Sequence, residues 1–147
     1  MGVYDGLRGG DRRIAAAAQA PGDIVELRLP PDSAYLSVLR TATAGLAARL
    51  DFTLDAIEDL RIAVDEACAL LLPDVVGDEP LTCRFVLEPD VLEVSVRAMT
   101  RDGKQPSRES FAWTVLTALA GEVDSSADPD GAVTVTLRRR RNGSGEA

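Results

Sequence analysis

The chain has 147 residues, 46% of them hydrophobic and 27% charged, with a net charge of −8. This length and composition are typical of one folded domain and exclude a disordered chain. The absence of histidine excludes Ser/His/Asp triads and histidine-containing zinc sites, and the acidic charge argues against nucleic-acid binding and favours a basic protein partner.

The two ends of the chain differ in composition from its middle. Residues 1–22 are rich in Gly, Ala and Arg and are predicted to be a flexible arm, residues 142–147 a disordered tail, and residues 23–141 the domain. No segment approaches the ~20 apolar residues of a membrane helix, and the patch IAAAA is short for a signal-peptide core. We therefore expect a cytoplasmic protein without a membrane partner, in which Cys68 and Cys83 are buried thiols. The run RRRR at 138–141 is expected to be a solvated tail.

In the first half of the chain, one strand precedes two helices. The segment VELRLP alternates like a half-buried strand, and two prolines end it. A helix is predicted over Ser33 to Leu50, and Thr53 is predicted to cap a second helix that runs to Pro73. Apolar residues recur along the first helix at helical spacing up to Leu50, and its buried stripe is expected to contain Leu36, Leu39, Thr43 and Leu46.

The second half of the chain returns to the period of strands. The run LTCRFVLEPDVLEVSVRA predicts a hairpin about residues 88–90, and residues 100–107 are a polar loop. A helix follows in SFAWTVLTALAG, with Phe111, Val115 and Leu119 on one face and Gly121 as its C-terminal cap. A short strand is expected near 122–125, a turn at 128–131 and a last strand at 132–138. The order β-α-α-β-β-α-β predicts an α+β two-layer sandwich, with three helices on one face of a mixed sheet.

One acidic residue of the second helix needs a separate explanation. Residues 64–73 read VDEACALLLP, a stretch that is apolar except for two carboxylates. Asp65 is expected to pair with Arg61, four residues earlier on the helix. Glu66 has no such neighbour, and an unpaired buried charge is costly. Either it reaches the rim of a pocket, or a partner that the sequence does not reveal holds it.

From Val25 to about Leu137 the chain resembles the anti-sigma factors of the RsbW and SpoIIAB type, serine kinases of the GHKL (HATPase_c) superfamily. The stretch RTATAGLAARLDFTLDAIEDLRIAVDEA and the helix LTALAGEVD carry this resemblance. It implies the GHKL, or Bergerat-type, ATPase fold, a homodimer, and Glu66 as the general base of phosphotransfer. It also implies that Arg40 contacts both the sigma factor and an anti-anti-sigma STAS-domain protein. Ala44 and Ala47 lie beside Arg40 on its helix and complete the expected partner-binding set.

The same resemblance shows which nucleotide-binding groups are missing. Where the family has a magnesium-binding Asn, four residues after the general base, this chain has Leu70. At the adenine-reading DxGxG motif it has Ala98, Thr100 and Asp102, with Gly103 one position off. At the GxG of the phosphate-covering lid it has Ser110 and Ala112. We therefore expect no ATP or magnesium cofactor and no metal site, with Glu66 a relic of the active site.

Two classes of function follow from these positions. The first is a binding protein that sequesters a sigma factor and is released by partner switching with the STAS antagonist, without kinase activity. The alternative is an active ATP-dependent anti-sigma serine kinase that phosphorylates the STAS antagonist, using Glu66 and an altered metal site. A weaker third possibility is that the former nucleotide pocket binds another small ligand.

An actinobacterial branch of the family has lost similar motifs. The fifteen Arg against the single Lys104 are typical of a GC-rich genome.

Overall fold

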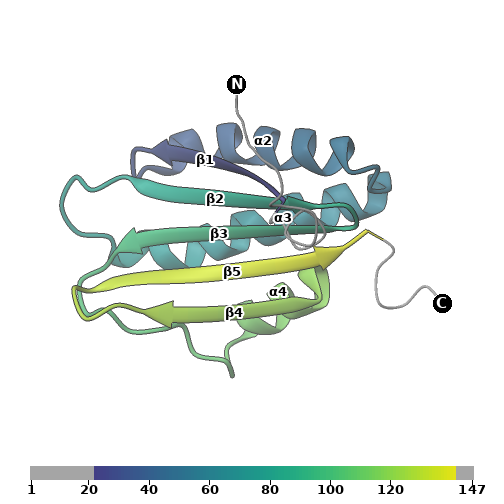
Figure 1. Cartoon of the computed structure of the whole chain (residues 1–147). Coiled ribbons are helices and arrows are strands. Elements are labelled where there is room, and N and C mark those ends of the chain that lie inside the picture. The colour runs from purple at the N-terminus through teal and green to yellow at the C-terminus, as the bar shows by residue number, and fades with distance from the viewer. Residues whose placement is uncertain (1–21, 142–147) are drawn as a thin grey trace, which may run out of the picture.

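The computed structural model describes residues 22–141, which form two layers (Figure 1). A five-stranded sheet makes up one layer, and three helices cover one of its faces. The predicted arm, apart from Gly22, and the predicted tail over 142–147 lie outside the described residues. The α+β two-layer fold is thus confirmed, whereas the division into arm, domain and tail stays a prediction.

The sheet is antiparallel throughout the described residues, which corrects the expected mixed sheet. Its strands are β1 (Asp23–Leu29), β2 (Leu81–Glu88), β3 (Val91–Met99), β4 (Glu122–Ala127) and β5 (Ala132–Arg140), in the spatial order β1-β2-β3-β5-β4. β3 and β4 run in the same direction, because each pairs antiparallel with β5. Because β5 lies between β3 and β4, these two parallel strands do not pair with each other, and every pairing in the sheet is antiparallel.

The helices are α2 (Leu36–Arg49), α3 (Leu54–Leu71) and α4 (Phe111–Ala120). The expected helix over Ser33 to Leu50 is divided, because residues Ser33–Tyr35 form a separate 3-10 turn, η1. A second 3-10 turn, η2 (Leu72–Asp74), follows α3. The predicted cap of α3 is confirmed, since the Thr53 hydroxyl accepts a hydrogen bond from the amide of Ala56 at 3.1 Å. Gly121 ends α4 with a φ of 91°, as glycine readily does.

The core lies between the sheet and α3, the central helix, which packs against α2 on one side and α4 on the other. Both cysteines are buried and free in this core, as predicted. Burial raises the pKa of Cys68 to about 12 and that of Cys83 to about 11. The thiols therefore remain protonated and belong to the packing. The largest fully buried side chains include Phe85, Leu39, Leu60, Leu92, Leu116 and Leu137.

The predicted apolar face of α4 is wrong by part of a turn. Trp113, Leu116 and Ala120 are the buried residues of this helix, whereas Phe111 is 82% exposed. Trp113 and Leu116 are large apolar side chains three residues apart on the face that meets the core, and Leu119 packs partly buried against the same core. Trp113 is thus a packing residue of the core.

The basic run at 138–141 is not a free tail, which corrects that prediction. β5 continues through Arg140, and Arg139 is only 17% exposed. The Arg139 guanidinium donates hydrogen bonds to the carboxylate of Asp59 in α3 and to the carbonyl of Leu119 in α4. This side chain therefore ties β5 to two helices.

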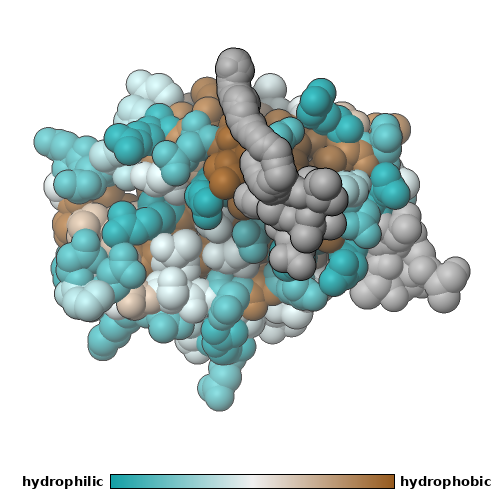
Figure 2. Space-filling model, in the orientation of Figure 1, coloured by the Kyte–Doolittle hydropathy of each residue, from teal (hydrophilic) through white to brown (hydrophobic). Residues whose placement is uncertain are grey.

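The face of the sheet away from the helices is mainly hydrophilic or neutral (Figure 2). On this face Arg138 of β5 lies among three carboxylates, those of Glu88, Glu93 and Glu122, at 3.4, 3.8 and 3.6 Å. None of the helices in the described part of the chain is long and apolar enough to cross a membrane.

Candidate functional site

Glu66 lies on α3 and is half-buried. Within residues 22–141 no side chain forms a hydrogen bond or an ion pair with it. Its immediate neighbours on the core side, Ala63 and Ala67, are fully buried. Because the carboxylate keeps partial contact with solvent, the chain avoids the cost of burying an unpaired charge. The position expected to hold the general base is thus at the boundary between core and surface.

Leu70 occupies the expected metal-ligand position, one turn after Glu66. Its side chain is half-buried and packs against the hydrophobic core cluster. Magnesium prefers oxygen ligands in octahedral geometry, and an aliphatic side chain offers none. In the described part of the chain, no group of three or more Cys, Asp or Glu side chains could hold a metal ion.

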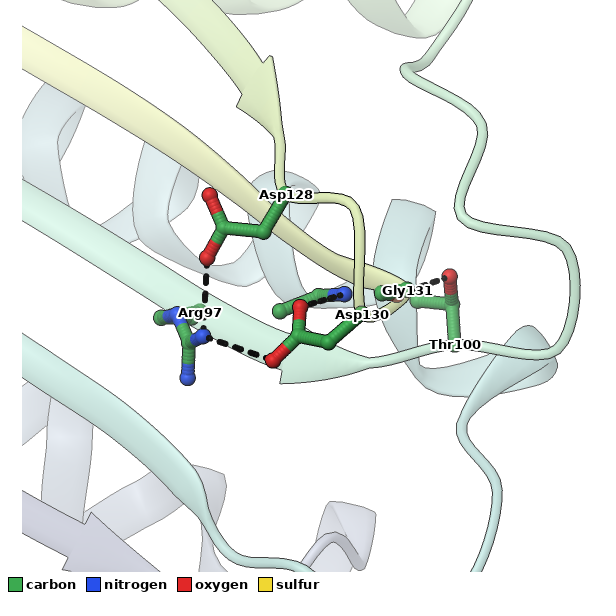
Figure 3. Close-up of polar contacts among 6 residues, drawn as sticks. Arg97, Thr100, Asp128, Asp130 and Gly131 are labelled. Carbon is green, nitrogen blue, oxygen red and sulfur yellow. Dashed lines mark hydrogen bonds and ion pairs between the residues drawn. The ribbon is translucent and has the colours of Figure 1, made fainter.

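The end of β3 carries the positions at which the resemblance implies adenine recognition. Ala98 is buried and Thr100 is only 6% exposed. The Thr100 hydroxyl donates a hydrogen bond to the carbonyl of Gly131 at 3.0 Å (Figure 3). It also accepts a hydrogen bond from the amide of Gly103 at 3.0 Å. Both the donor and an acceptor site of this hydroxyl are therefore used inside the protein.

Gly103, the glycine nearest to the expected nucleotide motif, lies against another glycine. A Cβ atom added at Gly103 would be 3.1 Å from the Cα of Gly131, which is tighter than most real contacts. Gly103 has a φ of 65° and Gly131 a φ of 100°, a region that favours glycine. The side chain of Asp102 accepts a hydrogen bond from the amide of Lys104 at 3.1 Å and so stabilises the same loop. These residues support a close approach of the loop to the turn at 128–131.

An ion-pair cluster holds that turn on the sheet. Arg97 of β3 donates to the carboxylate of Asp128 at 2.9 Å and lies 3.7 Å from that of Asp130 (Figure 3). The hydrogen bond to Asp128 raises the pKa of Arg97 above its usual value. The amide of Thr100 also donates to the carbonyl of Gly131 at 3.1 Å. We call the region made by residues 98–103 and the turn 128–131 the β3 corner.

The positions expected to cover the phosphates begin α4. Ser110 is its N-cap, accepting a hydrogen bond from the amide of Trp113 at 3.1 Å and donating one to the carbonyl of Ser107 at 2.9 Å. Ala112 is half-buried. The residue types at these two positions are therefore explained by helix initiation and packing.

The loop before α4 is anchored to the edge strand β4. Arg108 donates to the carboxylate of Asp124 at 2.9 Å, and its guanidinium lies 4.6 Å from the ring centre of Trp113. The hydrogen bond from Arg108 lowers the pKa of Asp124. Ser125 donates to the side-chain oxygen of Gln105 at 2.7 Å. Side chains of the loop thus hold it along the sheet.

The expected partner-binding residue Arg40 lies on α2 and contacts α3. Its Nη1 atom donates to both carboxylate oxygens of Asp65, at 3.0 and 3.2 Å. The predicted pair between Arg61 and Asp65 is therefore wrong: Arg61 pairs instead with Glu58, three residues earlier, at 3.2 Å. Asp65 lies on the side of α3 that faces α2, where Arg40 can reach it. Sequence spacing held no signal for this contact, because the two residues are 25 positions apart.

The two alanines of the expected set differ in burial. Ala44 is half-buried, whereas Ala47 is fully buried, in line with Leu39 and Thr43 on the core side of α2. Because Ala47 belongs to the core stripe, it cannot contact a partner in this structure, and the prediction is corrected. Gly45, which follows Ala44 on the same helix, has open space where a side chain would be.

Comparison with known proteins decides the family. No protein-family model matches the chain. However, the chain is 34% identical to the anti-sigma-F factor RsbW of Mycobacterium tuberculosis strain H37Rv, over 93% of this chain and 95% of that protein. The chain belongs to the RsbW family of anti-sigma factors. The resemblance drawn from the sequence is thereby confirmed.

Other RsbW relatives match over shorter stretches. The chain is 35% identical to the serine-protein kinase RsbW of Bacillus subtilis strain 168, over 50% of this chain and 48% of that protein. It therefore spans about half the length of that kinase. A solved structure of the RsbU and RsbW domains of a Mycobacterium tuberculosis protein has a TM-score of 0.64 and 17% identity, covering 82% of this chain and 33% of that one. This likeness supports the fold.

Proposed function

We propose that this RsbW-family protein sequesters a sigma factor by occlusion and does so without phosphoryl transfer. The observation that carries the proposal is the β3 corner, where Thr100, Gly103 and Gly131 contact one another through three hydrogen bonds and a close backbone approach. Phosphoryl transfer depends almost entirely on positioning and electrostatic stabilisation of the nucleotide. Residues committed to contacts within the protein do not supply these functions.

The charge of the protein supports a basic partner. With a net charge of −8, it is electrostatically complementary to a basic surface, such as the polymerase-binding surface expected of a sigma factor. Complementary charge mainly increases the association rate and specificity. Arg40 supplies a guanidinium for a carboxylate within that surface, and Ala44 lies beside it. Release would follow when an anti-anti-sigma STAS-domain protein competes for the same residues, and we propose a homodimer as the binding unit.

Reconstituted transcription tests this proposal. RNA polymerase core, the cognate sigma factor and a promoter template are combined with increasing amounts of the protein. The protein is not incubated with ATP before it is added. We expect transcription to fall as the protein is added and to recover when the STAS antagonist is added in excess. If transcription were unaffected at a large excess of the protein, the proposal would be refuted.

The alternative function is an active anti-sigma serine kinase, and the position of Glu66 favours it. This carboxylate is partly solvent-accessible on α3, where the resemblance places a general base, and relatives of the chain are named serine-protein kinase RsbW. Calorimetry with ATP and magnesium, followed by radiolabel transfer to the STAS partner, separates the two functions. We expect neither heat of binding nor transfer. Transfer by the wild type that is lost in Glu66→Gln would establish the kinase.

A further inference from the structure

Arg40 and Asp65 form a polar contact between the outer surfaces of α2 and α3. Their side chains are 34% and 38% exposed, so the pair lies at the surface without being fully solvated. Only one nitrogen of Arg40, Nη1, takes part, and it contacts both oxygens of Asp65. The pair therefore holds the guanidinium in place through one corner of its planar fork.

The remaining edge of this guanidinium is available for a ligand. A guanidinium has five N–H donors, and its Nε and Nη2 atoms together form an edge that fits a carboxylate in a bidentate manner. Neither atom has a hydrogen-bond partner among residues 22–141. The neighbouring pair of Arg61 and Glu58 does not offer such an edge, because the Nε atom of Arg61 is buried. Of these two arginines, Arg40 is the one poised to bind a second carboxylate.

We infer that Asp65 is a positioning residue that holds the Arg40 guanidinium with its Nε–Nη2 edge toward a carboxylate of the sigma factor. This inference rests on the proposed function. An arginine side chain has many rotamers, and fixing them during association reduces affinity. Because Asp65 restricts the side chain before the partner arrives, part of that cost is already met in the free protein.

Whether Asp65→Asn weakens or strengthens sigma binding distinguishes this positioning role from simple charge repulsion. Asp65 would repel an incoming carboxylate if it acted only as a nearby negative charge, so its removal would strengthen binding. A positioning role predicts the opposite for Asp65→Asn: roughly two- to tenfold weaker sigma binding, the effect of releasing one rotamer-rich side chain. Glu58→Gln is the matched control, because it removes the same charge from the same helix and releases Arg61 instead. We expect its affinity to be within about twofold of the wild type.

A double-mutant cycle tests whether Asp65 acts through Arg40. Sigma affinity is measured by surface plasmon resonance for Asp65→Asn in the wild-type background and in an Arg40→Ala background. We expect weakening in the first and no change in the second. Equal weakening in both backgrounds, or unchanged or tighter binding by Asp65→Asn alone, would overturn the inference. Melting temperatures of all variants confirm that they are folded.

A second measurement does not depend on the sigma factor. Nitrogen-15 NMR of the Arg40 side chain reports rotation about its Nε–Cζ bond. This rotation should be hindered in the wild type and faster in Asp65→Asn, while Glu58→Gln leaves it unchanged. Equally free rotation in the wild type and in Asp65→Asn would refute the positioning role. Failure of the wild type to bind the sigma factor would instead refute the proposed function, whichever way the NMR result falls.

Discussion

Polar groups have different hydrogen-bonding roles on the outer face of α2 and α3 and in the β3 corner. On the helix face, Arg40 binds Asp65 through a single nitrogen and keeps an edge for another ligand. In the β3 corner, the Thr100 hydroxyl both donates and accepts within the protein, and two glycine backbones fill the space between loop and turn. The first arrangement suits recognition of a partner, whereas the second suits structural stability.

Under the function proposed above, this difference separates a surface that binds a partner from a region that does not support phosphoryl transfer. A binding surface needs a few exposed groups with free hydrogen-bonding capacity, and helices present them without further support. Nucleotide chemistry needs a metal ligand, a base reader and flexible glycines at the same time. The predictions that follow test each side of the comparison, in order of decreasing expected effect.

The largest effect is expected from Gly131→Val in the β3 corner. Gly131 has a φ of 100°, and an added Cβ would lie 3.4 Å from the carbonyl oxygen of Thr100. A β-branched residue at such a backbone conformation should destabilise the protein by about 2–3 kcal/mol. Urea denaturation measures this loss. Gly45→Ala is the control, since α2 has open space there, and the change should stabilise the protein by about 0.5–1 kcal/mol. A stable Gly131→Val variant would show that the corner is not a structural unit.

The helix face is tested by Arg40→Glu. Sigma binding should weaken at least about tenfold, equivalent to about 1.4 kcal/mol, because the bidentate donor is lost and a repelling carboxylate replaces it. Antagonist binding should weaken as well if the site is shared. The loss of the half-exposed pair with Asp65 should cost at most about 1 kcal/mol of stability. Surface plasmon resonance with both partners provides the measurement.

Arg61→Glu is the matched control for that experiment, because Arg61 also forms an ion pair at the surface of the helix layer. We expect it to affect sigma binding much less than Arg40→Glu does. Undiminished sigma affinity in folded Arg40→Glu would remove Arg40 from the interface.

A smaller effect is expected when acid releases the loop before α4. The hydrogen bond from Arg108 keeps the pKa of Asp124 below its ordinary value of 3.8. A carboxylate with a lowered pKa stabilises the folded state above the unfolded pKa, and this contribution is lost as pH falls through the folded pKa. The protection factors of the amides in residues 104–110, taken relative to the intrinsic exchange rate at each pH, should therefore fall below about pH 4. Arg108→Gln should show fast exchange already at neutral pH. Exchange that does not depend on Arg108 would mean that this ion pair does not anchor the loop.

The smallest effect, none at all, is expected from Leu70→Asn. This change restores the amide at the magnesium position, but Thr100 and Gly103 remain bound within the β3 corner. Calorimetry with ATP and magnesium should show no binding by the variant, with the serine-protein kinase RsbW of Bacillus subtilis as positive control. Recovery of ATP binding would show that a single lost ligand, and not the whole corner, prevents nucleotide binding.

The sequence by itself determined the features that depend on near neighbours. The cap at Thr53, the hairpin after Glu88, the glycine that ends α4 and the alternation of the strands each depend on contacts within a few residues. The family was also readable, because the run from Arg40 to Ala67 is a continuous segment. Burial of the two thiols was predicted correctly, from the usual burial of free cysteine in a chain without disulfides.

Only the tertiary structure decided which distant groups meet. Arg40 pairs with Asp65 because α2 packs against α3. Arg139 of β5 forms a hydrogen bond with Asp59 of α3, 80 positions earlier in the sequence. The same packing buries Ala47, turns Phe111 toward solvent and places β5 between β3 and β4. Hydrophobic periodicity states that a face is buried, but not against which element. Contacts between elements depend on how several faces pack together, and no single segment contains that information.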